Sequence, residues 1–69
     1  MSFKEFKHRV NALAKKFNVY KEPVIECKGK NYFARIPGIV KIYGSERNAM
    51  CTYRWGDGHQ AVGLLPDVG

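Results

Sequence analysis

The chain has 69 residues, of which 45% are hydrophobic and 26% charged, a composition typical of a folded domain rather than of a disordered segment. This length allows one small domain near the lower limit for an unassisted core, and it leaves little room to bury a catalytic pocket. Twelve Lys and Arg against six Asp and Glu give a net charge of +6, which favours polyanionic partners and disfavours imitation of DNA by an acidic surface.

The first seventeen residues carry the clearest pattern, and it predicts an amphipathic helix over residues 2–17. Ser2 and Glu5 have the spacing of a capping box, which indicates where the helix begins. Asn18 tolerates a left-handed backbone and is expected to end the helix. The apolar residues recur with helical spacing and form one stripe wide enough to face a core: Phe3, Phe6, Val10, Leu13, Ala14 and Phe17.

The residues after the helix predict five short strands joined by turns. A connector over residues 19–23 ends at Pro23, which favours a strand that starts after it. The expected strands cover residues 24–27, 32–36, 39–43, 49–55 and 60–65. Their short connections permit only antiparallel pairing between neighbours, so an antiparallel meander is expected. Residues 67–69 are expected to form a mobile tail.

These elements predict a single α+β domain over residues 1–69, in which the N-terminal helix packs on one face of a curled four- to five-stranded antiparallel sheet. The alternative to an open sheet is closure toward a small barrel. Because side chains alternate along a strand, the face toward the helix is expected to carry Ile25, Cys27, Ala34, Ile36, Val40, Ile42, Cys51, Tyr53, Val62 and Leu64. The opposite face is then expected to carry Glu26, Lys28, Phe33, Arg35, Lys41, Tyr43, Thr52 and Arg54.

The second of these faces is basic with interleaved aromatic residues, a combination that favours nucleic acid as the partner. Cationic side chains pair with phosphates, and each ring that stacks on an unpaired base contributes about 1–3 kcal/mol. The alternative is a solvated face on which the rings only cover neighbouring strands. The predicted nucleic-acid-binding residues, for RNA or DNA, are Lys28, Phe33, Arg35, Lys41, Tyr43 and Arg54.

The helix offers a second basic surface on its polar side, formed by Lys4, Lys7, His8 and Lys15. It is either a phosphate-contacting stripe or simply the solvated side of an amphipathic helix. A helix that covers one sheet face points its polar side away from the other face. The two basic surfaces are therefore not expected to bind one short ligand together.

The segment 53–59 predicts an anchor for a protein partner. Trp is enriched at the energetic centres of protein interfaces, so Trp55 and His59 are the candidate anchor residues. The alternative is a core or rim Trp followed by a tight Gly-Asp-Gly turn. This pattern supports a second hypothesis, a protein-binding adaptor or inhibitor, of the kind that phages and plasmids encode to act on a host protein. An exposed strand edge would also allow a homodimer.

The sequence carries no recognisable catalytic or metal-binding motif, so we expect neither an enzyme nor a cofactor. Asp57 and His59 lack a third residue that would orient them, and no phosphate-binding glycine pattern is present. Cys27 and Cys51 have neither C-x-x-C nor zinc-type spacing, which indicates two small buried hydrophobes. The alternative is a disulfide between them if their strands are neighbours, which is rare in a reducing cytosol. No apolar run approaches the roughly 20 residues that span a bilayer, and no signal peptide is apparent. We expect a cytoplasmic protein without a membrane partner, in a host cytoplasm if a mobile element encodes it.

Overall fold

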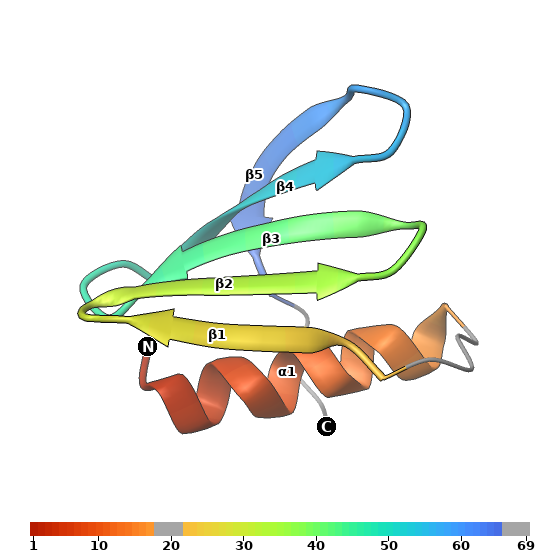
Figure 1. Cartoon of the computed structure of the whole chain (residues 1–69). Helices are drawn as coiled ribbons and strands as arrows, with labels where there is room; N and C mark the ends of the chain where they lie inside the picture. The colour runs from red at the N-terminus through yellow and green to blue at the C-terminus, as the bar shows by residue number, and fades with distance from the viewer. Residues whose placement is uncertain (18–21, 66–69) are drawn as a thin grey trace.

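A computed structural model describes residues 1–17 and 22–65 of the chain. One helix, α1 (Phe3–Lys16), precedes five strands: β1 (Val24–Lys28), β2 (Asn31–Ile36), β3 (Val40–Ser45), β4 (Met50–Trp55) and β5 (Gln60–Leu64). The strands pair antiparallel in the order of the sequence, β1-β2-β3-β4-β5 (Figure 1). The predicted α+β class and antiparallel meander are confirmed. The expected cap at Asn18, the first part of the connector and the tail 67–69 lie outside the described residues.

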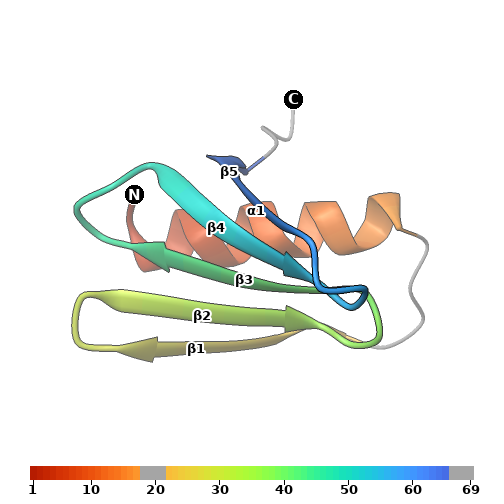
Figure 2. The same ribbon diagram turned by 90° about the horizontal axis from the view of Figure 1, so that it is seen from above.

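The sheet is open within the described part of the chain. β1 and β5 are its two edges, and Figures 1 and 2 show that β4 and β5 twist strongly away from β1 and β2 without meeting them again. Closure toward a barrel is therefore not confirmed.

The helix begins where the capping residues predict. The Ser2 hydroxyl oxygen accepts a hydrogen bond from the Glu5 backbone N–H at 3.1 Å, which satisfies one of the free N–H groups of the first turn. The Glu5 carboxylate does not complete a reciprocal capping box. It pairs instead with Arg9, one turn further along, at 2.7 Å.

Glycines with positive φ lie in three of the hairpin turns: Gly29, Gly38 and Gly58. Gly29 has φ = 61°, and the turn that it forms with Lys30 is shorter than predicted because β1 extends to Lys28 and β2 begins at Asn31. The predicted Pro37-Gly38 turn is present. Gly38 has φ = 77° and the Ile39 N–H donates to the Ile36 carbonyl at 3.0 Å, as in a type II turn.

The core lies between α1 and one face of the sheet, which we call the inner face. Figures 1 and 2 show α1 along this face. The rings of Phe3 and Phe6 lie 5.3 and 5.2 Å from the ring of Tyr32, and the Tyr32 hydroxyl donates to the Met1 carbonyl at 2.9 Å. The buried residues are Phe6, Val10, Leu13, Ala14, Tyr32, Ala34, Ile36, Val40, Ile42, Cys51, Tyr53 and Leu65.

The prediction for the last strand was wrong about its orientation. Val62 and Leu64 are 66% and 60% exposed, so they do not face the helix. Tyr53 pairs with Ala61 and Cys51 with Gly63, which places these two small residues of β5 on the inner face. Val62 and Leu64 therefore lie on the other face, and the buried residue of this segment is Leu65, just beyond the strand.

The prediction that both cysteines are buried was correct for Cys51 and wrong for Cys27. Cys27 lies on β1, opposite Tyr32, but β1 is an edge strand and no further described strand covers it. Ile25 on the same strand is only partly buried for the same reason. Both thiols are free.

Candidate nucleic-acid interface

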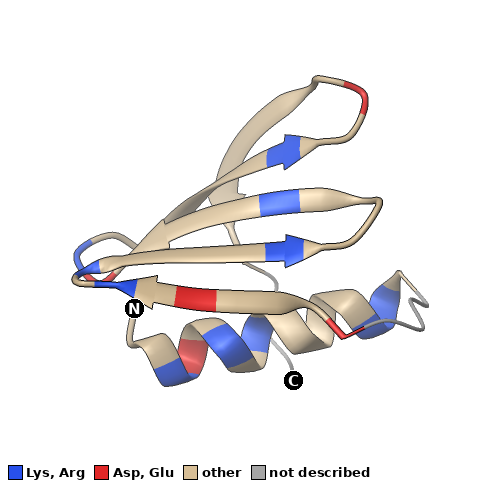
Figure 3. Ribbon diagram, viewed as in Figure 1, with Lys and Arg blue, Asp and Glu red and all other residues tan. Residues whose placement is uncertain are grey.

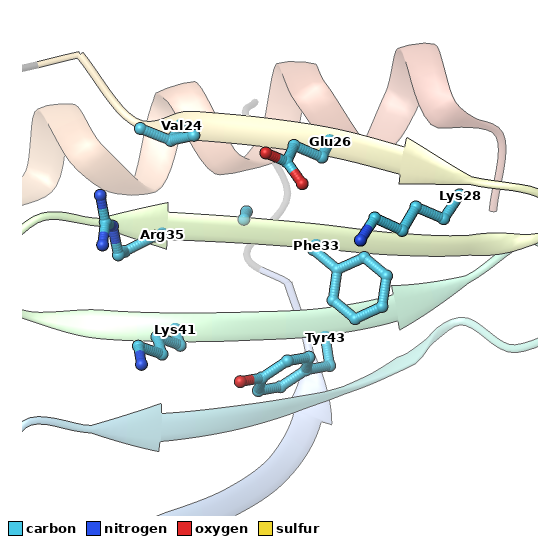
Figure 4. A pocket seen from close by; sticks show the side chains of 8 residues that line it. Val24, Glu26, Lys28, Phe33, Arg35, Lys41 and Tyr43 are labelled. Carbon is cyan, nitrogen blue, oxygen red and sulfur yellow. The ribbon is translucent and has the colours of Figure 1, made fainter.

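The face of the sheet turned away from α1, which we call the outer face, carries all six residues predicted to bind nucleic acid. Phe33, Arg35, Lys41 and Tyr43 come from the central strands β2 and β3. Figure 4 shows their side chains on the near side of the sheet, together with those of Val24, Glu26 and Lys28, while the helix lies behind. Arg54 on β4 pairs directly with Lys41 and so shares this face.

Three cations form a row across the outer face, at right angles to the strands. Arg35 pairs directly with Lys41, and Lys41 pairs directly with Arg54. We call these three exposed residues the cationic row. Figure 3 shows blue Lys or Arg segments side by side on β2, β3 and β4. Within residues 1–17 and 22–65, none of them forms an ion pair with an acidic side chain. Like charges at directly opposed positions destabilise a sheet, so this row costs folding free energy unless an anion binds it.

A second row, two residues along each strand, contains the aromatic rings. Phe33 pairs with Tyr43, and their ring centroids are 5.6 Å apart with planes at 88°, an edge-to-face contact. The Lys28 ammonium lies 5.9 Å from the Phe33 ring centroid, a cation–π contact. Glu26 pairs with Phe33 from the edge strand β1 and is the acidic residue of this row.

The two rows line an open hollow in the outer face. It has a volume of about 340 Å³ and is bounded by residues of β1, β2 and β3, including Phe33, Arg35, Lys41 and Tyr43. A second hollow of about 290 Å³ adjoins it beside the Pro37-Gly38 turn and shares Arg35 and Lys41 with it. Arg35 and Lys41 of the cationic row therefore border both concavities.

The predicted basic surface of the helix is separate from this face. Lys4, Lys7, His8 and Lys15 are exposed, and the Lys7 ammonium lies 5.1 Å from the Phe3 ring centroid. Because α1 packs on the inner face, the helix that carries these residues and the outer face lie on opposite sides of the sheet (Figure 1). A short ligand cannot contact both.

The two candidate anchor residues are not brought together as one exposed surface. Trp55 is partly buried, and its ring makes an edge contact with Phe17 at 5.9 Å on the helix side. His59 is exposed in the β4–β5 turn, where its Nδ1 lies 2.6 Å from the Asp57 carboxylate. The His59 backbone N–H also donates to that carboxylate, at 3.0 Å, and these hydrogen bonds lower the pKa of Asp57.

The other shifted pKa values belong to the core. Burial raises the pKa of the Cys51 thiol and of the Tyr32 and Tyr53 phenols, and that of Tyr53 reaches about 12. These groups are therefore protonated at neutral pH. Among the described residues, no three His, Cys, Asp or Glu side chains gather in a way that could hold a metal ion.

An exposed apolar strip, which the sequence analysis missed, extends the outer face beyond the aromatic rings. Met50, Val62 and Leu64 are 44%, 66% and 60% exposed; Met50 pairs with Leu64, and Val62 pairs with Thr52. We call these three residues the apolar strip. These three side chains point to the same face of the sheet as Thr52 and Arg54. Only the register between β5 and β4 reveals this for Val62 and Leu64.

Comparison of the chain with known protein families, with curated proteins and with solved structures finds no match. In the part of the chain that the structure describes, no helix has the length and apolar character needed to cross a membrane.

Proposed function

We propose that the protein binds nucleic acid, RNA or DNA, through the outer face of its sheet. The observation that supports this proposal is the cationic row: Arg35, Lys41 and Arg54 are directly opposed, exposed and without an acidic partner among the described residues. Phosphate groups would compensate the mutual repulsion of these three side chains. The neighbouring Phe33 and Tyr43 add ring surface for bases.

The test separates this site from the effect of net charge. In the sheet variant Arg35, Lys41 and Arg54 are changed to Gln, and in the helix variant Lys4, Lys7 and Lys15 are changed to Gln. Both variants lose three positive charges, but from opposite sides of the molecule. Fluorescence anisotropy with labelled oligonucleotides at low salt should give roughly tenfold or more weaker binding for the sheet variant and a much smaller loss for the helix variant.

Two outcomes would contradict the proposal. Absence of oligonucleotide binding by the unmodified protein at low salt would exclude it. Equal losses in the two variants would mean that binding follows net charge alone, without a site on the outer face. Circular dichroism of both variants confirms that they are folded before the affinities are compared.

A second candidate function is a protein-binding adaptor or inhibitor that acts on a host protein, and the apolar strip favours it. Met50, Val62 and Leu64 are exposed side by side on β4 and β5, and β5 is an edge strand without a charged residue. Such a strip suits an apolar protein surface, or a second copy of the chain paired through β5. A pull-down from nuclease-treated lysate, compared with the Val62→Lys variant, tests a protein partner, and light scattering tests the dimer.

A further inference from the structure

The geometry of the outer face points to single-stranded nucleic acid that crosses the strands, with its phosphates on the cationic row and a base stacked on Phe33. This inference rests on the proposed function and specifies its ligand. The shared chemistry is a phosphodiester chain with unpaired bases, which single-stranded RNA and single-stranded DNA both provide.

The two rows define the direction of the ligand. Arg35 and Phe33 are two residues apart on β2, and Lys41 and Tyr43 are two residues apart on β3, so the rows are parallel and roughly 7 Å apart. Arg35 and Arg54 are two strand spacings apart, or roughly 10 Å. A strand whose backbone follows the cationic row therefore has its bases over the aromatic row. A base paired within a duplex cannot reach a ring in this way, because its faces are already stacked.

Glu26 limits the site on one side. It pairs with Phe33 from β1, so its carboxylate lies at the end of the aromatic row. The residue of β1 next to the cationic row is Val24, which pairs with Arg35 and carries no charge. The Glu26 carboxylate repels phosphates, and the uncharged Val24 side chain does not attract them. A backbone that follows the cationic row therefore meets cations on β2, β3 and β4 but none at the adjoining position of β1.

Phe33 and Tyr43 have different roles in this arrangement. Figure 4, which looks onto the outer face, shows the Phe33 ring nearly face-on and the Tyr43 ring more obliquely, with its hydroxyl directed toward the side of Lys41. Phe33 is therefore the stacking platform, and Tyr43 supports its edge in the contact at 88°. Lys28 now lies over Phe33, but a cation–π contact at an exposed site is weaker than a base–aromatic stack, so a base displaces the Lys28 side chain.

The experiment compares single-stranded DNA, single-stranded RNA and the duplex of the same sequence. We expect each single strand to bind roughly tenfold more tightly than the duplex at equal salt. Phe33→Leu, which keeps an apolar side chain but removes the ring, should weaken single-strand binding by roughly tenfold and leave duplex binding unchanged. Phe17→Leu makes the same substitution at a 36% exposed ring on the helix side and is the matched control, with single-strand affinity within about twofold of the unmodified protein.

A second measurement needs no variant. In proton NMR spectra, the Phe33 ring resonances should move upfield when a single strand is added, and those of Phe3 on the helix side should not. Equal affinity for duplex and single strand, with no selective effect of Phe33→Leu and no Phe33 shift, would overturn this inference while leaving the proposed function intact. Absence of binding to all three oligonucleotides would overturn both.

Discussion

At the scale of single residues, Gly44 is a position where the core leaves little room for a side chain. A Cβ atom there would lie 3.0 Å from Phe6 Cε1 and 3.1 Å from Cys51 Sγ, and Phe6 is fully buried, so its neighbours restrict how far it can shift. We predict that Gly44→Ala lowers the free energy of unfolding by about 1–3 kcal/mol. Urea denaturation followed by circular dichroism measures this change.

Gly63 provides the control for this prediction, because a Cβ atom there would lie more than 4 Å from the other heavy atoms of the described residues, its chain neighbours aside. Alanine also reduces the entropy of the unfolded chain, so Gly63→Ala should be neutral or stabilising by up to about 1 kcal/mol. If the two alanine variants were equally stable, the close packing of Phe6 against β3 would be incorrect.

Because of the buried Tyr53 hydroxyl, we expect the free energy of unfolding to fall at alkaline pH. It is buried without a hydrogen-bond partner among the described residues, and burial raises its pKa to about 12. In the unfolded chain the pKa is about 10, so the unfolded state loses the proton first as the pH rises. The contribution of Tyr53 to stability is thus complete below about pH 10 and is lost toward about pH 12.

We therefore predict that Tyr53→Phe, which removes the ionisable group, makes the free energy of unfolding less dependent on pH in this alkaline range. At neutral pH the variant should be as stable as the unmodified protein or more stable by about 1 kcal/mol, because the buried hydroxyl has no partner to lose. Tyr43→Phe, on the exposed side of the sheet, is the control. A Tyr53→Phe variant destabilised at neutral pH would indicate that the hydroxyl forms a hydrogen bond in solution.

At the scale of the elements, the orientation of β5 is the feature to test. Val40 on β3 is 2% exposed, whereas Val62 on β5 is 66% exposed. We predict that Val40→Ala lowers the free energy of unfolding by about 2 kcal/mol, from lost burial and a residual cavity, and that Val62→Ala changes it by less than about 0.5 kcal/mol. Thermal unfolding of the two variants measures both. A comparable loss for Val62→Ala would mean that β5 has the opposite face toward the helix.

The same strand marks the limit of what the sequence predicts. The helix was predicted well because the stripe from Phe6 to Ala14 and the cap at Ser2 are local signals, and the outer-face residues of β2 to β4 were assigned correctly by alternation. In β5, alternation separates Ala61 and Gly63 from Val62 and Leu64 but does not say which set is inside. Hydrophobicity favoured Val62 and Leu64 as the inner-face residues. In the structure Tyr53 pairs with Ala61, which places Ala61 and Gly63 on the inner face instead.

Edge position is the other property that the local pattern did not reveal. Cys27 has the alternation of an inner-face residue, yet it is exposed because β1 has a neighbour on only one side. Tyr32 and Leu65 were missed as core residues. Tyr32 is in phase with Ala34 and Ile36, so alternation could have found it, whereas Leu65 is buried beyond the end of its strand.

At the scale of the whole molecule, the described chain carries basic side chains on two opposite surfaces, and this arrangement predicts how binding depends on salt. A ligand on the outer face meets three cations in the row, whereas the helix lysines lie on the far side of the sheet. Only phosphates in direct contact release their counterions. The salt dependence of the affinity for a short single strand should thus be set by the charges of the cationic row and not by the total charge of the protein.

Three phosphate contacts predict a slope of about −2 for the logarithm of the affinity against the logarithm of the salt concentration, or roughly 20-fold weaker binding between 50 mM and 200 mM salt. Arg54→Gln removes one contact and should reduce the slope by about 0.7, whereas Lys15→Gln on the helix should leave it unchanged. Anisotropy titrations over this salt range measure all three slopes. A slope near zero would mean that phosphates do not bind the row, and an equal reduction in both variants would mean that helix and sheet share one ligand, contrary to their opposite positions in the fold.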